Sequence, residues 1–368
     1  MTGTSRRQFL PALHGLRGLM ALWILAYHTS PNGFGLFRVS SYGYLAVDVF
    51  FVLSGYVLMH SHGGQFKCLT WTSSVSFWRL RWWRVYPLCL LSVILSISLF
   101  HALRGFWPTG GRIIESLLIL DGWARPGIGL NVPAWSLGVE VVGYLAFPLV
   151  ARCLMGLNGR QSIVCLALVL SAATVYMSII DDTWDHSYGF PAVARMTAGF
   201  GAGCLLFTLE AAAPSRSREY GDILIGAAVA GLACVLLADQ LTLVLPFLAC
   251  LVYGAAASQG RGAAVLGSWP FLFFGRISFS LYLTHFLVME AVVALMGGRS
   301  PRLLDKLAGT GAVVTASIGL AWLVCVTVEE PVRRWGRRRP RLGAGAALPV
   351  VVSGLVPTAP RQDRRSLQ

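Results

Sequence analysis

Long apolar stretches separated by short polar connections dominate this sequence. A helix that crosses a membrane needs about 20 mostly apolar residues. Ten segments meet that requirement: residues 11–29, 42–60, 85–102, 134–154, 162–180, 191–209, 221–237, 241–258, 277–296 and 307–328. The run at 113–120 is too short to cross, so we expect a half-helix or an interfacial segment there. The pattern predicts an all-α fold, a polytopic membrane helix bundle of about ten transmembrane helices.

Composition supports an integral membrane protein. Of the 368 residues, 55% are hydrophobic and only 12% are charged, and the mean hydropathy of +0.65 is far above that of soluble domains. We therefore expect one membrane domain over residues 1–332. The chain then becomes arginine-rich, and we expect a basic, partly disordered cytoplasmic tail over residues 333–368.

The net charge of +14 is distributed as a membrane topology requires. Basic residues gather in connections on alternate sides of the predicted helices, at 6–7, 67–84, 152–160, 216–218 and 333–341, whereas the loop at 181–185 is acidic. Since short cytoplasmic loops are enriched in lysine and arginine, we expect both termini in the cytoplasm. The basic residues should contact membrane lipid, and no nucleic acid partner is expected.

Ionisable side chains inside the spans are the first candidates for chemistry, because they are costly unless paired or facing a wet cavity. Arg17 and His28 are separated by a spacing that places them about 20° apart around a helix and about 16 Å apart along it. They can line one path without touching. Asp48 needs a cation, and Arg17 or an arginine of the next loop is the expected partner. A purely structural role for His28 or Asp48 also fits the pattern.

Two further segments carry polar stripes. Arg81 and Arg84 present guanidinium groups about one turn apart at a helix entrance, which suits a polyphosphate. A positive cluster with an aromatic belt explains the same residues. Glu140 and Tyr144 share a helix face with Ser136. Cysteines and histidines show no metal-ligand spacing, so we expect no metal.

Taken in order, these elements resemble the bacterial membrane acyltransferase-3 family, which contains polysaccharide and lipopolysaccharide O-acetyltransferases. The resemblance extends from Leu10 to Arg334, with Phe279 in place of a usual tyrosine and Gly143 where an aromatic residue is common. Its motifs are Arg17-x10-His28, FFxxSG at 50–55 with Asp48 before it, Arg81-x-x-Arg84-x-x-Pro87, an N-x-x-x-WSL-x-x-E segment from Asn131 to Pro148, a GxxSYxxYLxH-like element at 275–285, and Glu330-Pro331.

The resemblance implies an O-acyltransferase of the bacterial plasma membrane. It would move an acyl group, usually acetyl, from acyl-coenzyme A to a hydroxyl of a carbohydrate or glycosylated acceptor. An acyltransferase for a small secondary metabolite such as a macrolide is an alternative. A lipid or glycan carrier is another, because carriers also hold arginines and carboxylates inside a bundle.

On this reading His28 is the general base for the acceptor hydroxyl, because a neutral imidazole accepts a proton near neutral pH. Arg17 and Asp48 form a buried pair that holds the first two helices together. Glu140 either orients His28 or shares the acid–base work.

The acyl-coenzyme A is expected at the cytoplasmic end of the bundle. Arg81 and Arg84 hold its phosphates, and the thioester arm follows the polar stripe past Ser54 and Tyr144. With a sulfur leaving group, the reaction needs no metal.

Overall fold

The computed structural model describes residues 9–29, 38–123, 129–180, 188–296 and 303–338. Every regular element within these residues is helical. The α-helices are α1 (Pro11–Thr29), α2 (Ala46–His62), α3 (Trp71–Arg104), α4 (Gly110–Leu117), α5 (Trp135–Leu154), α6 (Gly159–Ile179), α7 (Gly189–Ala212), α8 (Pro214–Leu237), α9 (Val244–Ala257), α10 (Arg261–Leu266), α11 (Trp269–Leu295), α12 (Leu303–Val324) and α13 (Glu330–Arg338).

Short elements extend several of these helices. They are the 3-10 turns η2 (Arg38–Leu45), η3 (Gly63–Phe66), η4 (Val132–Ala134) and η5 (Leu241–Leu243), and the π-helical turn η6 (Cys325–Glu329). The turn η6 joins α12 to α13 without a break in the helix.

The predicted membrane bundle is confirmed. Each of the ten predicted spans falls on a helix, and eight helices of the described chain are long and apolar enough to cross a membrane. The other two predicted spans are α1, which contains an arginine and two histidines, and α9, which has 14 residues. The short run at 113–120 overlaps α4, a helix of eight residues.

Helix α3 contains the predicted span 85–102 and extends well before it. Helix α3 begins at Trp71 and not near residue 85, and its first turn is capped by Thr70, whose side chain accepts a hydrogen bond from the backbone N–H of Ser73. Arg81 and Arg84 therefore lie about 15 to 20 Å inside a helix of 34 residues. The arginines lower the local hydropathy, so apolar length alone predicts a span only from about residue 85.

The predicted tail begins within a helix. Helix α13 continues through the predicted boundary at residue 332 and ends at Arg338. Residues 339–368 of the predicted tail, the arginines at 6–7 and the acidic loop at 181–185 lie outside the described residues.

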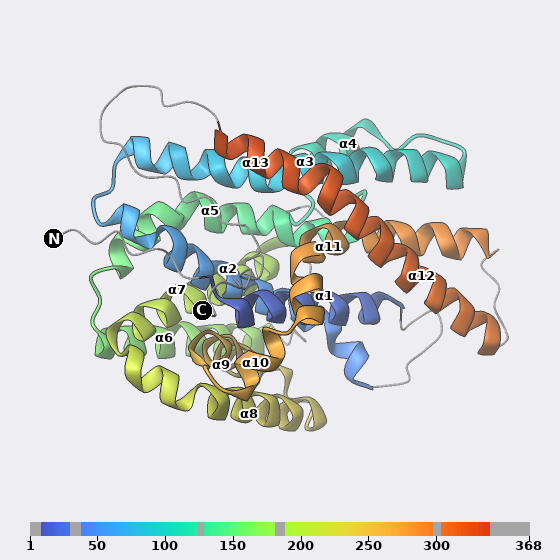
Figure 1. Cartoon of the computed structure of the whole chain (residues 1–368). Helices are drawn as coiled ribbons and strands as arrows, with labels where there is room; N and C mark the ends of the chain where they lie inside the picture. Colours follow the sequence, from blue (N-terminus) through green and yellow to red (C-terminus); the bar gives the residue numbers. More distant parts are fainter. Residues whose placement is uncertain (1–8, 30–37, 124–128, 181–187, 297–302, 339–368) are drawn as a thin grey trace, which may run out of the picture.

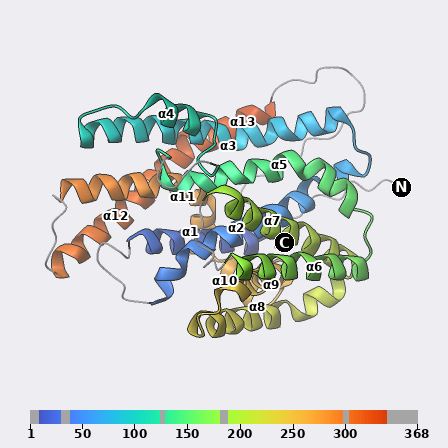
Figure 2. The same cartoon turned by 180° about the vertical axis from the view of Figure 1, so that it is seen from behind.

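Helices α1 and α2 lie in the middle of the bundle, with α3 and α4 on one side and α8 on the other (Figures 1 and 2). Helix α1 packs mainly on α11, and α2 packs mainly on α7. Arg17 contacts Ser278, and His28, further along α1, contacts His285 further along α11. The two helices are therefore parallel, as the first and ninth of ten alternating spans must be.

Glycines let α1 and α11 approach to backbone contact. A Cβ atom on Gly18 would lie 2.5 Å from the backbone nitrogen of Gly275. A Cβ atom on Gly275 would lie 2.1 Å from the carbonyl oxygen of His14. Small residues at helix crossings are the usual way to bring membrane helices close together. Here the crossing places the polar residues of both helices side by side.

Candidate active site

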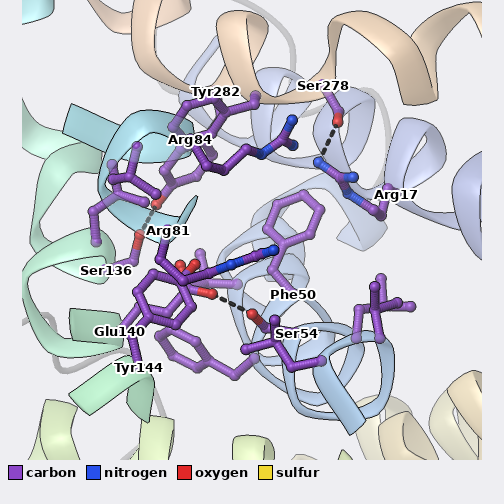
Figure 3. A pocket seen from close by; sticks show the side chains of 18 residues that line it. Arg17, Phe50, Ser54, Arg81, Arg84, Ser136, Glu140, Tyr144, Ser278 and Tyr282 are labelled. Carbon is purple, nitrogen blue, oxygen red and sulfur yellow. Dashed lines mark hydrogen bonds between the residues drawn. The ribbon is translucent and has the colours of Figure 1, made fainter. Parts of the chain in front are cut away.

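A cavity of about 160 Å³ lies among α1, α2, α3, α5 and α11. Its polar lining comes from all five helices (Figure 3): Arg17, Ser54, Arg81, Arg84, Ser136, Glu140, Tyr144, Ser278 and Tyr282. The rest of the lining is apolar, with side chains such as Phe50, Leu58 and Phe279. The cavity thus joins a charged region to an apolar one inside the membrane bundle.

The lining of this cavity carries more positive than negative side chains. Arg17, Arg81 and Arg84 reach it from α1 and α3, and Glu140 is the one carboxylate among the lining residues. Figure 3 shows the three arginine side chains extending toward the same space. Arg17 donates a hydrogen bond to the Oγ of Ser278 at 3.1 Å. Three guanidinium groups beside one lining carboxylate favour an anionic ligand.

Arg84 forms an ion pair with Glu329, a residue that was not predicted for the site. Its guanidinium lies 3.2 Å from the Oε1 of Glu329, which is 4% exposed. The hydroxyl of Ser280 donates to the other oxygen of the same carboxylate at 2.8 Å. Glu329 ends the π-helical turn η6, and such turns occur often at functional sites. The signal in the sequence was a carboxylate directly beside the Glu330-Pro331 motif.

The polar stripe predicted on α5 lies in the cavity. Glu140 accepts a hydrogen bond from Ser54 of α2 and is hydrogen-bonded to Tyr144. One turn before Glu140, the hydroxyl of Ser136 lies 2.8 Å from that of Tyr282 on α11. The stripe therefore links α2, α5 and α11.

The expected pair of Arg17 and Asp48 is wrong. Asp48 binds Arg195 of α7 through both of its oxygens, with Nη2–Oδ2 at 2.8 Å and Nε–Oδ1 at 3.2 Å. The side chains are 0% and 1% exposed, and neither residue lines the cavity. The physical reason is that α2 packs on α7, so the nearest cation to Asp48 comes from a span that the sequence places far away.

His28 lies outside the cavity lining and makes a different contact from the one expected. Its Nδ1 lies 3.0 Å from the Nε2 of His285 on α11, whereas the hydrogen bonds of Glu140 go to Ser54 and Tyr144. The expectation that Glu140 orients His28 is therefore wrong. Tyr282 connects the two regions, because it lines the cavity and its ring centroid is 6.2 Å from that of His285.

Six of the eight residues predicted for the site are brought together at the cavity: Arg17, Ser54, Arg81, Arg84, Glu140 and Tyr144. Of the other two, His28 is three turns from Arg17 toward the other end of α1, and Asp48 belongs to the buried pair with Arg195. An all-helical membrane bundle with an arginine-lined internal cavity and a nearby histidine pair fits an enzyme that handles a charged, partly apolar substrate.

Comparison with known proteins identifies the class. The sequence profile of the acyltransferase-3 family, described as an acyltransferase domain, matches residues 10–327. The chain belongs to this family and is a membrane acyltransferase. The carrier alternative is thereby set aside.

Several curated proteins resemble the chain. Acyltransferase MdmB of Streptomyces mycarofaciens is 30% identical, and the alignment covers 90% of this chain and 94% of the relative. YrhL of Bacillus subtilis, described as a candidate peptidoglycan O-acetyltransferase, is 26% identical over 55% of this chain and 34% of the relative. O-acetyltransferase OatA of Staphylococcus aureus is 25% identical over 77% of this chain and 51% of the relative. No solved structure matches the chain.

Proposed function

We propose that this protein transfers a short acyl group, acetyl in the first instance, from acyl-coenzyme A to a hydroxyl of a small glycosylated metabolite such as a macrolide. It does so as a multi-pass protein of the bacterial plasma membrane with both termini in the cytoplasm. The observation that carries the proposal is the arginine-lined cavity inside a bundle of this family.

The extent of the matches weakens the argument for a polymer acceptor. The relative whose name specifies peptidoglycan is matched over about a third of its length. The Streptomyces relative, named simply as an acyltransferase, is matched along nearly its whole length and at higher identity. We therefore take the Streptomyces relative as the better guide to this chain, and its name specifies no polymer acceptor.

The proposal that acyl-coenzyme A is the donor rests on the charged and the apolar regions of the cavity. Coenzyme A combines phosphates with a thinner, less polar arm that ends in the thioester. Arg81 and Arg84 suit the phosphates, since guanidinium groups bind phosphate through paired hydrogen bonds. Ser54 and Tyr144, together with the neighbouring apolar side chains, line the path for the arm.

In the proposed reaction, the hydroxyl oxygen of the acceptor attacks the thioester carbonyl. The new O–C bond forms as the C–S bond breaks, so coenzyme A leaves as the thiolate. His28 takes the hydroxyl proton as general base and returns it to the thiolate. Arg17, which is anchored by Ser278 and is three turns away from His28 on the same helix, lies on the donor side and adds positive charge for the anionic donor.

The first experiment measures release of the free thiol from acetyl-coenzyme A by the purified protein in lipid nanodiscs. A macrolide with free sugar hydroxyls is the acceptor probe, and mass spectrometry detects the acetylated product. His28→Ala should lower the transfer rate by about 1,000-fold, the scale of a lost general base, with unchanged amounts of folded protein. A His28→Ala variant that turns over like the wild type would disprove the base assignment.

An envelope polymer is the second candidate acceptor, because relatives include O-acetyltransferases and one is described for peptidoglycan. Mass spectrometry of cell-envelope glycans and of secreted metabolites, with and without the gene, separates the two. Loss of acetyl groups from the glycans alone would replace the small-metabolite acceptor by a polymer and leave the chemistry intact.

A further inference from the structure

Two histidines meet where α1 and α11 run side by side. His28 is partly exposed, whereas His285 is fully buried at 0% exposure. The Nε2 of His285 lies 3.0 Å from the Nδ1 of His28, and the ring centroids are 4.9 Å apart. His285 thus touches the base of the proposed reaction from behind and is itself shielded from substrate.

The backbone determines where the protons of this pair lie. The Nδ1 of His285 is 2.9 Å from the carbonyl oxygen of Leu281, and the Nδ1 of His28 is 3.0 Å from that of Ile24. A carbonyl oxygen only accepts hydrogen bonds, so in the neutral pair each Nδ1 carries the hydrogen. The Nε2 of His285 is then an acceptor, and it receives the Nδ1–H of His28, which is shared with Ile24.

The opposite tautomers are disfavoured for the same reason. A hydrogen on the Nε2 of either ring would leave that ring's Nδ1 lone pair facing a carbonyl oxygen at about hydrogen-bond distance. Two such acceptor–acceptor contacts would form within the buried pair. The network therefore selects one arrangement, in which the lone pair of His28 is on Nε2.

Within the described residues, no group donates a hydrogen bond to the Nε2 of His28. Both hydrogen bonds of His28 involve its Nδ1. Tyr27 and Phe286 contact the ring of His28 through their own rings, with centroids at 5.0 and 5.5 Å. The aromatic neighbours hold the plane of the imidazole and leave its Nε2 for a ligand.

We propose that His285 is a positioning residue that fixes the tautomer and orientation of His28, so that the Nε2 of His28 is the atom that receives the acceptor's proton. This inference rests on the proposed acyl transfer. As the proton arrives at Nε2, positive charge develops on His28, and its Nδ1–H donates more strongly to His285. The pair thereby stabilises the charged form without moving a proton onto His285.

The test compares two amide substitutions of His285 in the nanodisc assay with acetyl-coenzyme A and the macrolide probe. Glutamine places its amide oxygen near the original Nε2, whereas asparagine carries the same group but is too short to reach His28. We expect His285→Asn to lower kcat by about 100-fold, within the range of general-base effects, with an unchanged KM for acetyl-coenzyme A. His285→Gln should stay within about tenfold of the wild type.

The pair of variants separates positioning from folding, because both bury the same polar amide. Equal kcat values for His285→Gln and His285→Asn would overturn the inference, as would loss of coenzyme A binding in step with kcat. His28→Ala is measured alongside. If His28→Ala remains active, the proposed function has lost its base; if it is inactive while His285→Asn is not impaired, only the role of His285 fails.

Discussion

Two charged regions lie inside this bundle, and they are built in opposite ways. At the interface of α2 and α7, one carboxylate meets one guanidinium through two hydrogen bonds, and both side chains are almost completely buried. At the cavity, three arginines and one carboxylate face open space, and one of the arginines, Arg84, is also paired with Glu329 behind the lining. Charges that satisfy one another fasten helices together, whereas an excess of one sign beside a cavity indicates a ligand of the other sign.

The largest effect is expected when one partner of the buried Asp48–Arg195 pair is removed. Asp48→Ala leaves Arg195 buried beside Trp135 without its carboxylate, and should cost about 3–5 kcal/mol of folding free energy. Thermal unfolding of the protein in detergent measures the loss. The double variant Asp48→Leu with Arg195→Met should recover much of it, because two apolar side chains leave no unpaired charge. Equal stability of Asp48→Ala and the wild type would show that the pair does not fasten the helices.

Loss of Arg81 at the cavity should weaken ligand binding and leave the folding stability unchanged. Arg81→Ala should weaken the binding of coenzyme A by about 10- to 100-fold, since a hydrogen bond to a charged group contributes about 1.5–3 kcal/mol. Isothermal titration of coenzyme A into the nanodisc-embedded protein measures the affinity. Arg79→Ala is the matched control, because Arg79 lies on the same helix but is exposed and outside the cavity lining. Unchanged affinity in Arg81→Ala would remove this arginine from the donor site.

Arg84 sharpens the comparison because it belongs to both kinds of site. It lines the cavity and also neutralises the buried Glu329. Arg84→Ala should therefore weaken coenzyme A binding and also destabilise the protein, whereas Arg81→Ala should do only the first. Thermal unfolding and titration of the two variants, side by side, measure the difference. A stable Arg84→Ala protein would mean that Glu329 does not depend on this arginine.

The smallest expected effect is at Ser278, whose hydroxyl anchors Arg17. Ser278→Ala removes the hydrogen bond to Arg17, of about 1 kcal/mol, together with the bond that the hydroxyl donates to the backbone oxygen of Gly275, and should lower the transfer rate by about fivefold. The control is Ser317→Ala on α12, since the buried hydroxyl of Ser317 has no hydrogen-bond partner in the described chain. Equal rates in both variants would show that the position of Arg17 does not depend on Ser278.

Much of the molecule was predictable from the chain alone. Apolar length predicted the membrane helices because a bilayer imposes the same requirement on every span. Helical periodicity predicted that Glu140 and Tyr144 share a face, and they do so at the cavity. Most of the helical turns before residue 85 were not predicted, because the arginines that line the cavity lower the hydropathy of this part of α3.

The sequence by itself determined which side chains are charged, on which helix each lies and which face it occupies, because these follow from local geometry. Only the tertiary structure decided the partners: Asp48 with Arg195, Arg84 with Glu329, and His28 with His285. These partners are 147, 245 and 257 residues apart in the chain. Such contacts depend on which helices pack together, and close crossings such as that of Gly18 on Gly275 become visible only when the bundle is assembled.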